Sequence, residues 1–379
     1  QPHFFAQNIN FVIFIHQIHT PFLRFHGHLG NLKGFLYKVS MKTLAAAPIS
    51  VDLPPSPLEA LASSLSDDML EVNRVILTRM QSDVPLIPQL AGYLIASGGK
   101  RIRPLMTLAA TRLFDSATER PYALAASVEF IHTATLLHDD VVDESDLRRG
   151  KPTANTVFGN QSAVLVGDFL FSRAFELMVE DGSLDVLRIL SRASAIISEG
   201  EVLQLSIQNK LDTTIDQYIA VIGAKTAALF AAACEIGPVV AGQAPAMIAA
   251  LKNYGYYLGM AFQIADDILD YEADEVQLGK SVGDDFKEGK MTAPIIFALQ
   301  NATTTDRAFW ERTFVNHDYQ DADLGTAQNI LNTSGALDKT RALAHSYIDK
   351  AVSSLAIVPN SALKTTLEQL AFYVLARKT

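Results

Sequence analysis

Two clusters of aspartates interrupt stretches of the sequence that otherwise read as buried helix. Both have the pattern Asp-Asp-apolar-apolar-Asp, and they are Asp139, Asp140 and Asp143 (the first acidic cluster) and Asp266, Asp267 and Asp270 (the second acidic cluster). Residues four apart lie one above the other on a helix, so each cluster stacks two carboxylates that repel each other unless a cation lies between them. Oxygen ligands of this kind suit Mg²⁺, which shares its remaining coordination positions with water and phosphate oxygens. We therefore expect two facing metal-binding sites.

The acidic residues could also be solvated helix ends or part of a di-iron site. Solvated ends are disfavoured because apolar helix precedes both clusters, as "EFIHTATLLH" and "YYLGMAFQIA". Glu129 and His132 form one Glu-x-x-His, a motif that a di-iron helical bundle needs twice. No other His in the chain has Glu three residues before it. A pair of magnesium sites is the better interpretation.

Basic residues near the two clusters suggest an anionic substrate. "SGGKRIRP" presents Lys100, Arg101 and Arg103 after two glycines and before an expected helix, which lets the backbone and side chains approach an anion closely. It is not a P-loop, because GxxxxGK[ST] is absent. Further basic segments hold Arg148 and Arg149 in "DLRRGKPT", Lys225 beside Thr226 in "GAKTAAL", and Lys280, Lys287 and Lys290 in "LGKSVGDDFKEGK". Each alone fits surface charge equally well, whereas the ordered set favours phosphate binding.

The elements that position these residues are expected to be helices. From about Ser64 onward the apolar pattern has helical period, alanine and leucine recur in runs, and no strand pattern of convincing length appears. These features predict an all-α fold, a single large helical bundle over residues 64–379. Residues 41–63, rich in Ala, Pro and Ser, are expected to be a flexible lead-in.

Residues 1–40 differ from the rest of the chain. They contain no Asp or Glu and five of the nine histidines, and the first methionine is Met41. We interpret them as a non-native upstream or presequence-like segment. A transit peptide would need more than three basic residues, and a membrane anchor would need a longer apolar run than "INFVIFIHQIH". We expect no transmembrane segment.

Charge and cysteine content exclude some classes of function. The net charge of −10 argues against a nucleic-acid partner, which needs a basic face. The one cysteine, Cys234, excludes an internal disulfide framework, and its setting in "AAACEIG" favours an inert buried thiol in a reducing compartment.

The ordered motifs resemble a known family. The series GGKRxRP, DDxxD followed by RRGKPT, GDxL, KT, FQxxDDxxD and GKSxGDDxxEGKxT looks like a trans-isoprenyl diphosphate synthase, or polyprenyl diphosphate synthase. The resemblance extends from Leu65 to the C-terminus. It implies the isoprenoid synthase type of helical bundle, with a central cavity.

The resemblance also implies roles for individual residues. Mg²⁺, three ions per site, with Mn²⁺ as the alternative, would be held by Asp139, Asp143, Asp266 and Asp270, and the catalytic set adds Asp140, Asp267 and Lys225. The residues matched to isopentenyl diphosphate binding are Lys100, Arg103, His132 and Arg149. The residues matched to the allylic diphosphate (farnesyl or geranylgeranyl) are Arg148, Lys225, Thr226, Gln263, Lys280 and Lys290.

The implied reaction is a repeated head-to-tail addition of isopentenyl diphosphate. The allylic diphosphate leaves, the isopentenyl double bond attacks the cation, and the released diphosphate takes the proton. In short-chain members of the family, the fourth or fifth position before the first cluster is a bulky aromatic residue. Here these positions are Thr135 and Ala134, so we expect a long product of the octaprenyl, solanesyl or decaprenyl type. A bulky residue deeper along the channel, such as Phe169 or Phe171, would then limit its length.

Two rival functions remain at this level. A class I terpene cyclase shares one acidic motif but normally lacks GGKRxRP, and a non-catalytic subunit of a heteromeric prenyl synthase usually loses motif residues. The long-chain synthase is expected to be a homodimer in the bacterial cytoplasm, with a mitochondrial location as the alternative. We expect peripheral membrane contact for product release, and a product that becomes the side chain of a quinone such as ubiquinone.

Overall fold

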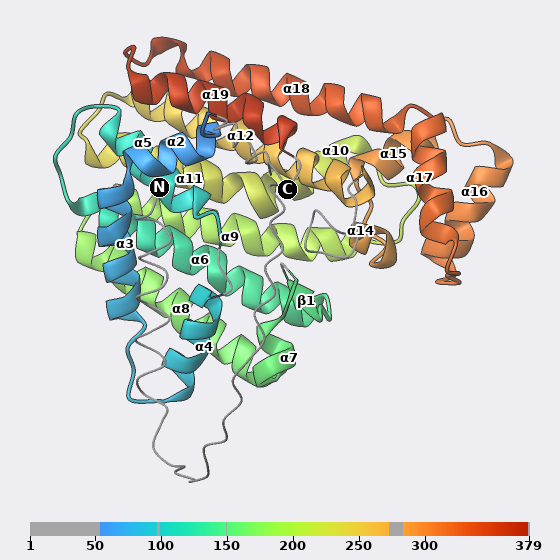
Figure 1. Ribbon diagram of the computed structural model, residues 1–379, viewed down its shortest axis with the longest axis horizontal. Coiled ribbons are helices and arrows are strands. Elements are labelled where there is room, and N and C mark those ends of the chain that lie inside the picture. Colours follow the sequence, from blue (N-terminus) through green and yellow to red (C-terminus); the bar gives the residue numbers. More distant parts are fainter. Residues whose placement is uncertain (1–53, 97–98, 149, 273–282, 378–379) are drawn as a thin grey trace, which may run out of the picture. The chain divides into compact units, whose positions relative to one another are not determined.

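The computed structural model describes residues 54–96, 99–148, 150–272 and 283–377, which form a helical domain (Figure 1). The expected segment 1–40, the first part of the lead-in, and Arg149 and Lys280 lie outside these residues. The helices and strands are α2 (Pro57–Ser64), α3 (Ser66–Arg79), α4 (Leu86–Ala96), α5 (Ile102–Arg112), α6 (Arg120–Val142), β1 (Leu147–Arg148), β2 (Lys151–Pro152), α7 (Ala154–Phe158), α8 (Asn160–Asp181), α9 (Leu184–Ile207), α10 (Ile215–Ile222), the π-helical turn η1 (Gly223–Ala227), α11 (Ala228–Val240), α12 (Pro245–Glu272), α14 (Asp284–Lys287), α15 (Ala293–Gln300), α16 (Thr304–Trp310), the π-helical turn η2 (Glu311–Val315), α17 (Asp323–Thr333), α18 (Ala336–Ser354), the 3₁₀ turn η3 (Leu355–Ile357) and α19 (Ala362–Ala376). The all-α expectation is confirmed.

The first described helix begins earlier than the expected domain boundary at residue 64. Ser56 and Glu59 form a capping box, in which each side chain bonds to the other residue's backbone N–H. Leu61, one turn on, is fully buried in the core. The cap and this burial together explain why α2 forms within the segment expected to be flexible.

The helices that carry the acidic clusters lie inside the bundle. α6 packs against α8, α5 and α3, and α12 packs against α11 and α18. α11 also contacts α5, α6 and α9, so it lies between the two cluster-bearing helices (Figure 1). α18 and α19 cover the opposite side of α12 along the top of the view. The clusters therefore belong to helices that are surrounded by other helices, as their apolar flanks predicted.

Close approach of α5 to α11 depends on a glycine. A Cβ atom added to Gly237 would lie 2.6 Å from the backbone carbonyl carbon of Ala110 and 2.7 Å from the amide nitrogen of Thr111. Any larger residue would force the two helices apart. Their close packing brings the start of α5, where Arg103 lies, against α11, where its guanidinium sits 4.6 Å from the Phe230 ring centroid.

A short hairpin follows the first acidic cluster. β1 and β2 are antiparallel, with Arg148 opposite Lys151, and Gly150 turns the chain with a φ of 71°. The Thr153 hydroxyl donates to the Ser145 carbonyl at 2.6 Å, which ties the hairpin to the end of α6. The hairpin thereby holds Arg148 beside α6.

Within the described ranges, one helical run has the length and hydropathy to cross a membrane. It is Ile215–Val240, which comprises α10, η1 and α11, and 72% of its most apolar window is buried inside the protein. Buried core helices meet the same criteria of length and composition.

Candidate active site

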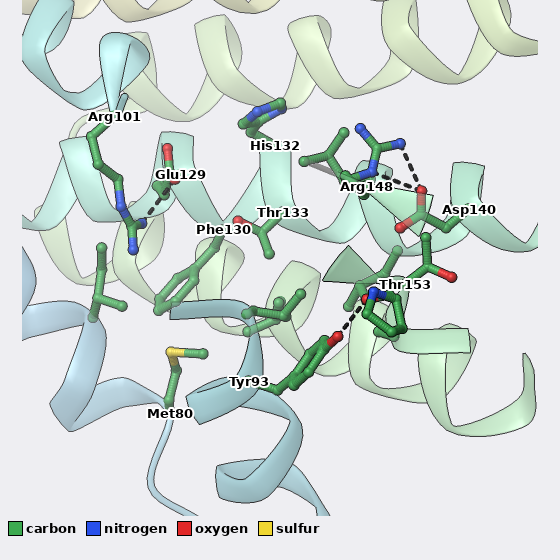
Figure 2. Close-up of a pocket in the computed structure, with 17 residues that line it drawn as sticks. Met80, Tyr93, Arg101, Glu129, Phe130, His132, Thr133, Asp140, Arg148 and Thr153 are labelled. Carbon is green, nitrogen blue, oxygen red and sulfur yellow. Dashed lines mark hydrogen bonds and ion pairs between the residues drawn. The ribbon is translucent and has the colours of Figure 1, made fainter. Parts of the chain in front are cut away.

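The first acidic cluster lies at the C-terminal end of α6. The helix ends at Val142, and Asp143 is its C-cap residue, whose backbone N–H still donates to the Asp139 carbonyl at 2.7 Å. Asp143 therefore lies one turn beyond Asp139, as its spacing predicted. Asp140 is 4% exposed and pairs with Arg148, whose Nε and Nη2 lie 2.8 and 2.6 Å from its Oδ1 (Figure 2). Asp140 thus holds Arg148, while Asp139 and Asp143 stay partly exposed.

The second acidic cluster lies wholly within α12. Asp267 is 3% exposed and accepts hydrogen bonds from the Tyr218 hydroxyl at 2.5 Å and from Gln263 Nε2 at 2.8 Å. Asp270 accepts the backbone N–H of Asp285 at 3.1 Å. Burial, followed by repulsion from Asp285, raises the pKa of Asp267 and of Asp270 to about 8. A positive charge near these carboxylates would return both to the ionised form.

The Lys290 ammonium group connects the two clusters by way of Asp285. Lys290 Nζ lies 3.5 Å from Asp143 and 3.8 Å from Asp285, which in turn bonds to Asp270 through its backbone. Burial tends to lower the pKa of Lys290, but attraction to Asp285 and Asp143 outweighs it and raises that pKa. Lys290 therefore links the end of α6 to the end of α12, and the two clusters face one site.

Lys225, on the π-helical turn η1, joins the first acidic cluster to α9. Its Nζ lies 3.5 Å from Asp139 and 2.7 Å from Glu201 of α9. Burial tends to lower the pKa of Lys225, but attraction to Asp139 and Glu201 raises it, so the ammonium stays charged. π-helical turns inside helices often occur at functional sites, and this one aims Lys225 at the first acidic cluster.

Thr226 and Gln263, expected to contact substrate, are engaged within the chain. The Thr226 hydroxyl donates to Gln263 Oε1 at 2.8 Å, and the Gln263 amide donates to Asp267 at 2.8 Å. This relay holds the Asp267 carboxylate in place together with Tyr218. Both residues therefore lie at the site, although their polar atoms are engaged with each other and with Asp267 in this state.

The basic groups at the start of α5 lie close to α6. Arg103 Nη1 is 2.9 Å from His132 Nε2, and Arg101 Nη1 is 2.8 Å from Glu129. Figure 2 shows Arg101, His132 and Arg148 along one side of α6. The Glu129–His132 pair that raised the di-iron alternative is thus bound to arginines. Lys100 is exposed just before α5, and Arg149 and Lys280 lie outside the described residues.

Two cavities adjoin this constellation. The first, about 810 Å³ including its open mouth, lies among α3, α4, α6 and the hairpin (Figure 2). Its wall runs from polar residues to apolar residues, among them Arg101, His132, Asp140, Arg148, Met80, Leu94, Phe130 and Leu137. The second, about 600 Å³, is lined by residues that include Tyr218, Lys225, Gln263, Asp267 and Lys290. Together they give charged groups access to space for a substrate.

Ala134 and Thr135 lie outside the linings of these two cavities. Ala134 is fully buried in the core, and the Thr135 hydroxyl donates to the His132 carbonyl at 2.8 Å. Thr133, on the neighbouring face of α6, lines the first cavity. The expected channel beside Ala134 therefore stays a prediction.

The aspartate carboxylates suit a hard divalent cation that takes most of its ligands from water and substrate. In the described ranges, no group of three or more His, Cys, Asp or Glu side chains is arranged to hold one metal ion. Asp139 with Asp143, and Asp266 with Asp270, instead offer pairs of carboxylates. Mg²⁺ usually binds through one or two carboxylates and fills its remaining positions with water and phosphate oxygens, so the residues fit such an ion.

Sequence reasoning missed several residues of this site. Glu201 and Tyr218 were not singled out, although "SEGEVLQL" places a Gly-Glu pair in an apolar helix. Arg377, near the C-terminus, lies 3.3 Å from Asp266 with its guanidinium 3.9 Å from the Phe262 ring centroid. Burial lowers the pKa of Arg377, and Asp266 opposes that shift. A single charged residue forms no sequence motif. Only its contact with Asp266 in the folded protein identifies Arg377 as a residue of the site.

Known proteins resemble this chain over most of its length. The polyprenyl synthetase family model matches residues 84–331. Octaprenyl diphosphate synthase of Escherichia coli K12 is 46% identical over 320 residues, which cover 84% of this chain and 99% of that protein. All-trans-nonaprenyl-diphosphate synthase of Rhodobacter capsulatus is 41% identical over 323 residues, 84% of this chain and 97% of that protein.

Solved structures agree with these relatives. A decaprenyl diphosphate synthase from Rhodobacter capsulatus superposes with a TM-score of 0.82 at 49% identity, covering 85% of this chain and 100% of that one. A polyprenyl synthase from Caulobacter crescentus CB15, complexed with calcium and isoprenyl diphosphate, superposes with a TM-score of 0.83 at 50% identity, covering 86% and 100%. The chain belongs to the polyprenyl synthetase family, and it is a prenyltransferase with the all-α isoprenoid synthase fold.

The raised pKa of Asp270 predicts how stability depends on pH without divalent cations. An acid whose pKa is higher in the folded than in the unfolded protein binds more protons when folded, so the free energy of unfolding falls as pH rises from about 4 toward 8. At pH 8 with a chelator, Asp270→Asn should raise the melting temperature by about 2 °C or more, because it removes a buried charge. Mg²⁺ with inorganic pyrophosphate should stabilise the wild type and not this variant.

Calorimetric melting curves at pH 5 and pH 8 measure both effects. Asp349→Asn, at an exposed position of α18, removes the same charge away from the site and should behave like the wild type throughout. An Asp270→Asn protein that melts like the wild type under all these conditions would contradict the electrostatic account.

Proposed function

We propose that this polyprenyl synthetase is a long-chain trans-polyprenyl diphosphate synthase. It adds isopentenyl diphosphate head-to-tail and repeatedly to an allylic diphosphate such as farnesyl or geranylgeranyl diphosphate. The observation that carries the proposal is the meeting of both acidic clusters. Lys290 contacts Asp143 of the first cluster and also Asp285, whose backbone N–H donates to Asp270 of the second. The long product rests on the octaprenyl, nonaprenyl and decaprenyl synthases that resemble the chain.

The two rival functions fit less well. A class I terpene cyclase needs only one such aspartate motif, whereas both clusters here face the site together. A non-catalytic subunit usually lacks motif residues, whereas this chain keeps both acidic clusters and the basic residues at the start of α5. The similar synthases are also matched over nearly their whole length.

The proposed metal ligands are the outer carboxylates of each acidic cluster, which are partly exposed, whereas the middle ones are buried and bonded to other side chains. Asp139 and Asp143, and Asp266 and Asp270, would hold Mg²⁺, in three ions per site, with Mn²⁺ as a substitute. Bound divalent cations stabilise the departing diphosphate by neutralising its charge. The Caulobacter crescentus structure with calcium and isoprenyl diphosphate supports a divalent-cation site of this kind.

The chain's own cations would bind the two substrates. We assign Lys225, Lys290 and Arg148, with the undescribed Lys280, to the allylic diphosphate, and Arg103, His132 and Lys100, with the undescribed Arg149, to isopentenyl diphosphate. Asp140 holds Arg148 in position, and Thr226 and Gln263 hold the Asp267 carboxylate. Such preorganised charge stabilises the diphosphate as its C–O bond breaks to leave an allylic cation. The isopentenyl double bond then forms the new C–C bond, and the released diphosphate takes the proton.

Burial around the acidic clusters serves the same reaction. An allylic cation reacts with water. Apolar surroundings must therefore exclude water while the new C–C bond forms. Phe230 beneath Arg103 and Phe262 beneath Arg377 place aromatic faces next to the charged groups. These faces also stabilise neighbouring cations through their π electrons.

The setting of the enzyme is part of the proposal. We propose that the enzyme works in bacterial cytoplasm, as expected from its bacterial relatives, with transient membrane contact that releases an apolar product. We further propose that the product becomes the side chain of a quinone such as ubiquinone. Fractionation of expressing cells and quinone analysis of a strain that lacks the gene are the measurements that address these points.

A product assay separates the three functions. Purified protein is incubated with Mg²⁺, radiolabelled isopentenyl diphosphate and farnesyl diphosphate, and the products are analysed by mass spectrometry. We expect long linear prenyl diphosphates, and no product after addition of a chelator. Cyclic hydrocarbons would instead identify a cyclase, and absence of any product would identify an inert subunit.

Product length tests the channel beside α6. Ala134→Tyr places an aromatic ring where the growing chain is proposed to pass, so the main product should lose several isoprene units. Thr133→Tyr is the matched comparison, because Thr133 lines the first cavity on the neighbouring face of the same helix. Unchanged products from Ala134→Tyr, with shortened products from Thr133→Tyr, would move the channel to that cavity.

A homodimer is proposed through α8 and α9. Both helices carry large apolar side chains that are exposed in the single chain. They are Val164, Leu165, Phe175 and Val179 on α8, and Leu184, Val202 and Leu205 on α9. Exposed apolar side chains gathered on neighbouring helices are candidates for a protein interface.

Light scattering of the full chain measures the oligomeric state. The wild type should be a dimer, and Leu165→Glu should shift it toward monomer because it places a charge in the proposed interface. Leu70→Glu, at an exposed leucine on α3, is the control and should leave the dimer intact. A monomeric wild type would refute the proposal.

A further inference from the structure

Glu201 occupies a position that the proposed reaction does not yet use. It lies on α9, directly after Gly200, and α9 packs against the turn η1. A Cβ atom added to Gly200 would lie 2.6 Å from Ala224 Cβ and 3.0 Å from the Lys225 amide nitrogen. The glycine therefore lets α9 approach η1 closely enough for the next side chain to reach Lys225.

Three charged side chains meet at this contact. The Lys225 ammonium lies 2.7 Å from Glu201 Oε2 and 3.5 Å from Asp139 Oδ2. The side chains of Lys225, Glu201 and Asp139 are 24%, 27% and 15% exposed, so water screens the group only in part. The short contact is made to Glu201, and the longer one to Asp139 exceeds the distance of a strong N–H···O bond. Glu201 thus sets how close Lys225 comes to the first acidic cluster.

The distance between the Lys225 ammonium and Asp139 matters both for a divalent cation and for a bound diphosphate. An ammonium group has three N–H donors, and one of them is taken by Glu201, so the others are left to face the site. If the ammonium moved onto Asp139, it would compete with a divalent cation for that carboxylate. It would also turn its donors away from a bound diphosphate.

The second oxygen of Glu201 gives an independent indication. Oε1 is buried, and it has no hydrogen-bond partner among the residues that the structure describes. A buried carboxylate oxygen normally has a donor, so this one points to a donor from outside the chain. Water bound to a hydrated divalent cation is such a donor, because Mg²⁺ keeps several of its waters.

We propose that Glu201 is a positioning residue, which holds Lys225 beside Asp139 and not on it, so that Lys225 binds diphosphate while Asp139 remains available to the divalent cation. The proposal rests on the proposed prenyl transfer. It differs from a packing role, because it depends on the negative charge of Glu201 and not on its shape.

Two substitutions separate charge from shape. Glu201→Gln keeps the size of the side chain and removes the charge, whereas Glu201→Asp keeps the charge and shortens the side chain. We expect Glu201→Gln to raise the Mg²⁺ concentration for half-maximal activity about tenfold, as expected from the loss of one charged hydrogen bond, and to lower kcat. Glu201→Asp should lie between Glu201→Gln and the wild type on both measures.

Direct binding supplies a readout that does not depend on turnover. Isothermal titration of Mg²⁺ into protein with inorganic pyrophosphate should show affinity about tenfold weaker for Glu201→Gln, and a smaller loss for Glu201→Asp. Glu199→Gln, at an exposed site on the same helix, is the matched control and should bind and turn over like the wild type. Circular dichroism confirms that each variant is folded.

Two outcomes would overturn the inference. Wild-type Mg²⁺ binding and kinetics in Glu201→Gln would show that the charge is not needed, and an equal or larger defect in Glu201→Asp would show a packing role. The wild type keeps the two proposals distinct, because an inactive wild type refutes the proposed function, whereas an active wild type with an unaffected Glu201→Gln refutes only the role of Glu201.

Discussion

Repulsion among carboxylates is the constraint on which this site depends. The ends of α6 and α12 bring six aspartates toward one place, and α14 adds Asp285 beside them. In partly buried surroundings such charges destabilise the fold unless cations lie among them. Lys225 and Lys290, from separate parts of the chain, supply some of the compensating positive charge. Because the two lysines compensate the negative charge only in part, the arrangement that strains the fold is also suited to divalent cations, whose positive charge would relieve the remaining repulsion.

The two acidic clusters divide their residues in the same way. The middle aspartate of each, Asp140 or Asp267, is almost fully buried and bonded to other side chains, to Arg148 in one case and to Tyr218 and Gln263 in the other. The outer aspartates remain partly exposed. The helix repeat explains this division, since the middle residue points about 100° away from the first. In each cluster one carboxylate is thus bonded within the chain, and the two outer carboxylates are partly exposed.

Close backbone contact between helices fixes where the charged side chains of the site lie. Gly200 allows α9 to approach η1, and Gly237 allows α11 to approach α5. Each contact delivers a cation: Lys225 to the first acidic cluster, and Arg103 to His132 on α6. Closely packed elements leave little free space between them, so groups from separate segments can be held at defined distances.

The sequence by itself determined the helical class, the two acidic clusters and the small residues Ala134 and Thr135, because helical period and i, i+4 spacing are local properties. It also contained the ordered basic motifs, whose resemblance to polyprenyl synthases indicated the family. Only the tertiary structure decided that Asp140 holds Arg148 and that Glu201 and Arg377 join the site. The partners of Glu201 and Arg377 lie 24 and 111 residues away in the chain, and their distances depend on how closely the segments pack, which no local pattern records.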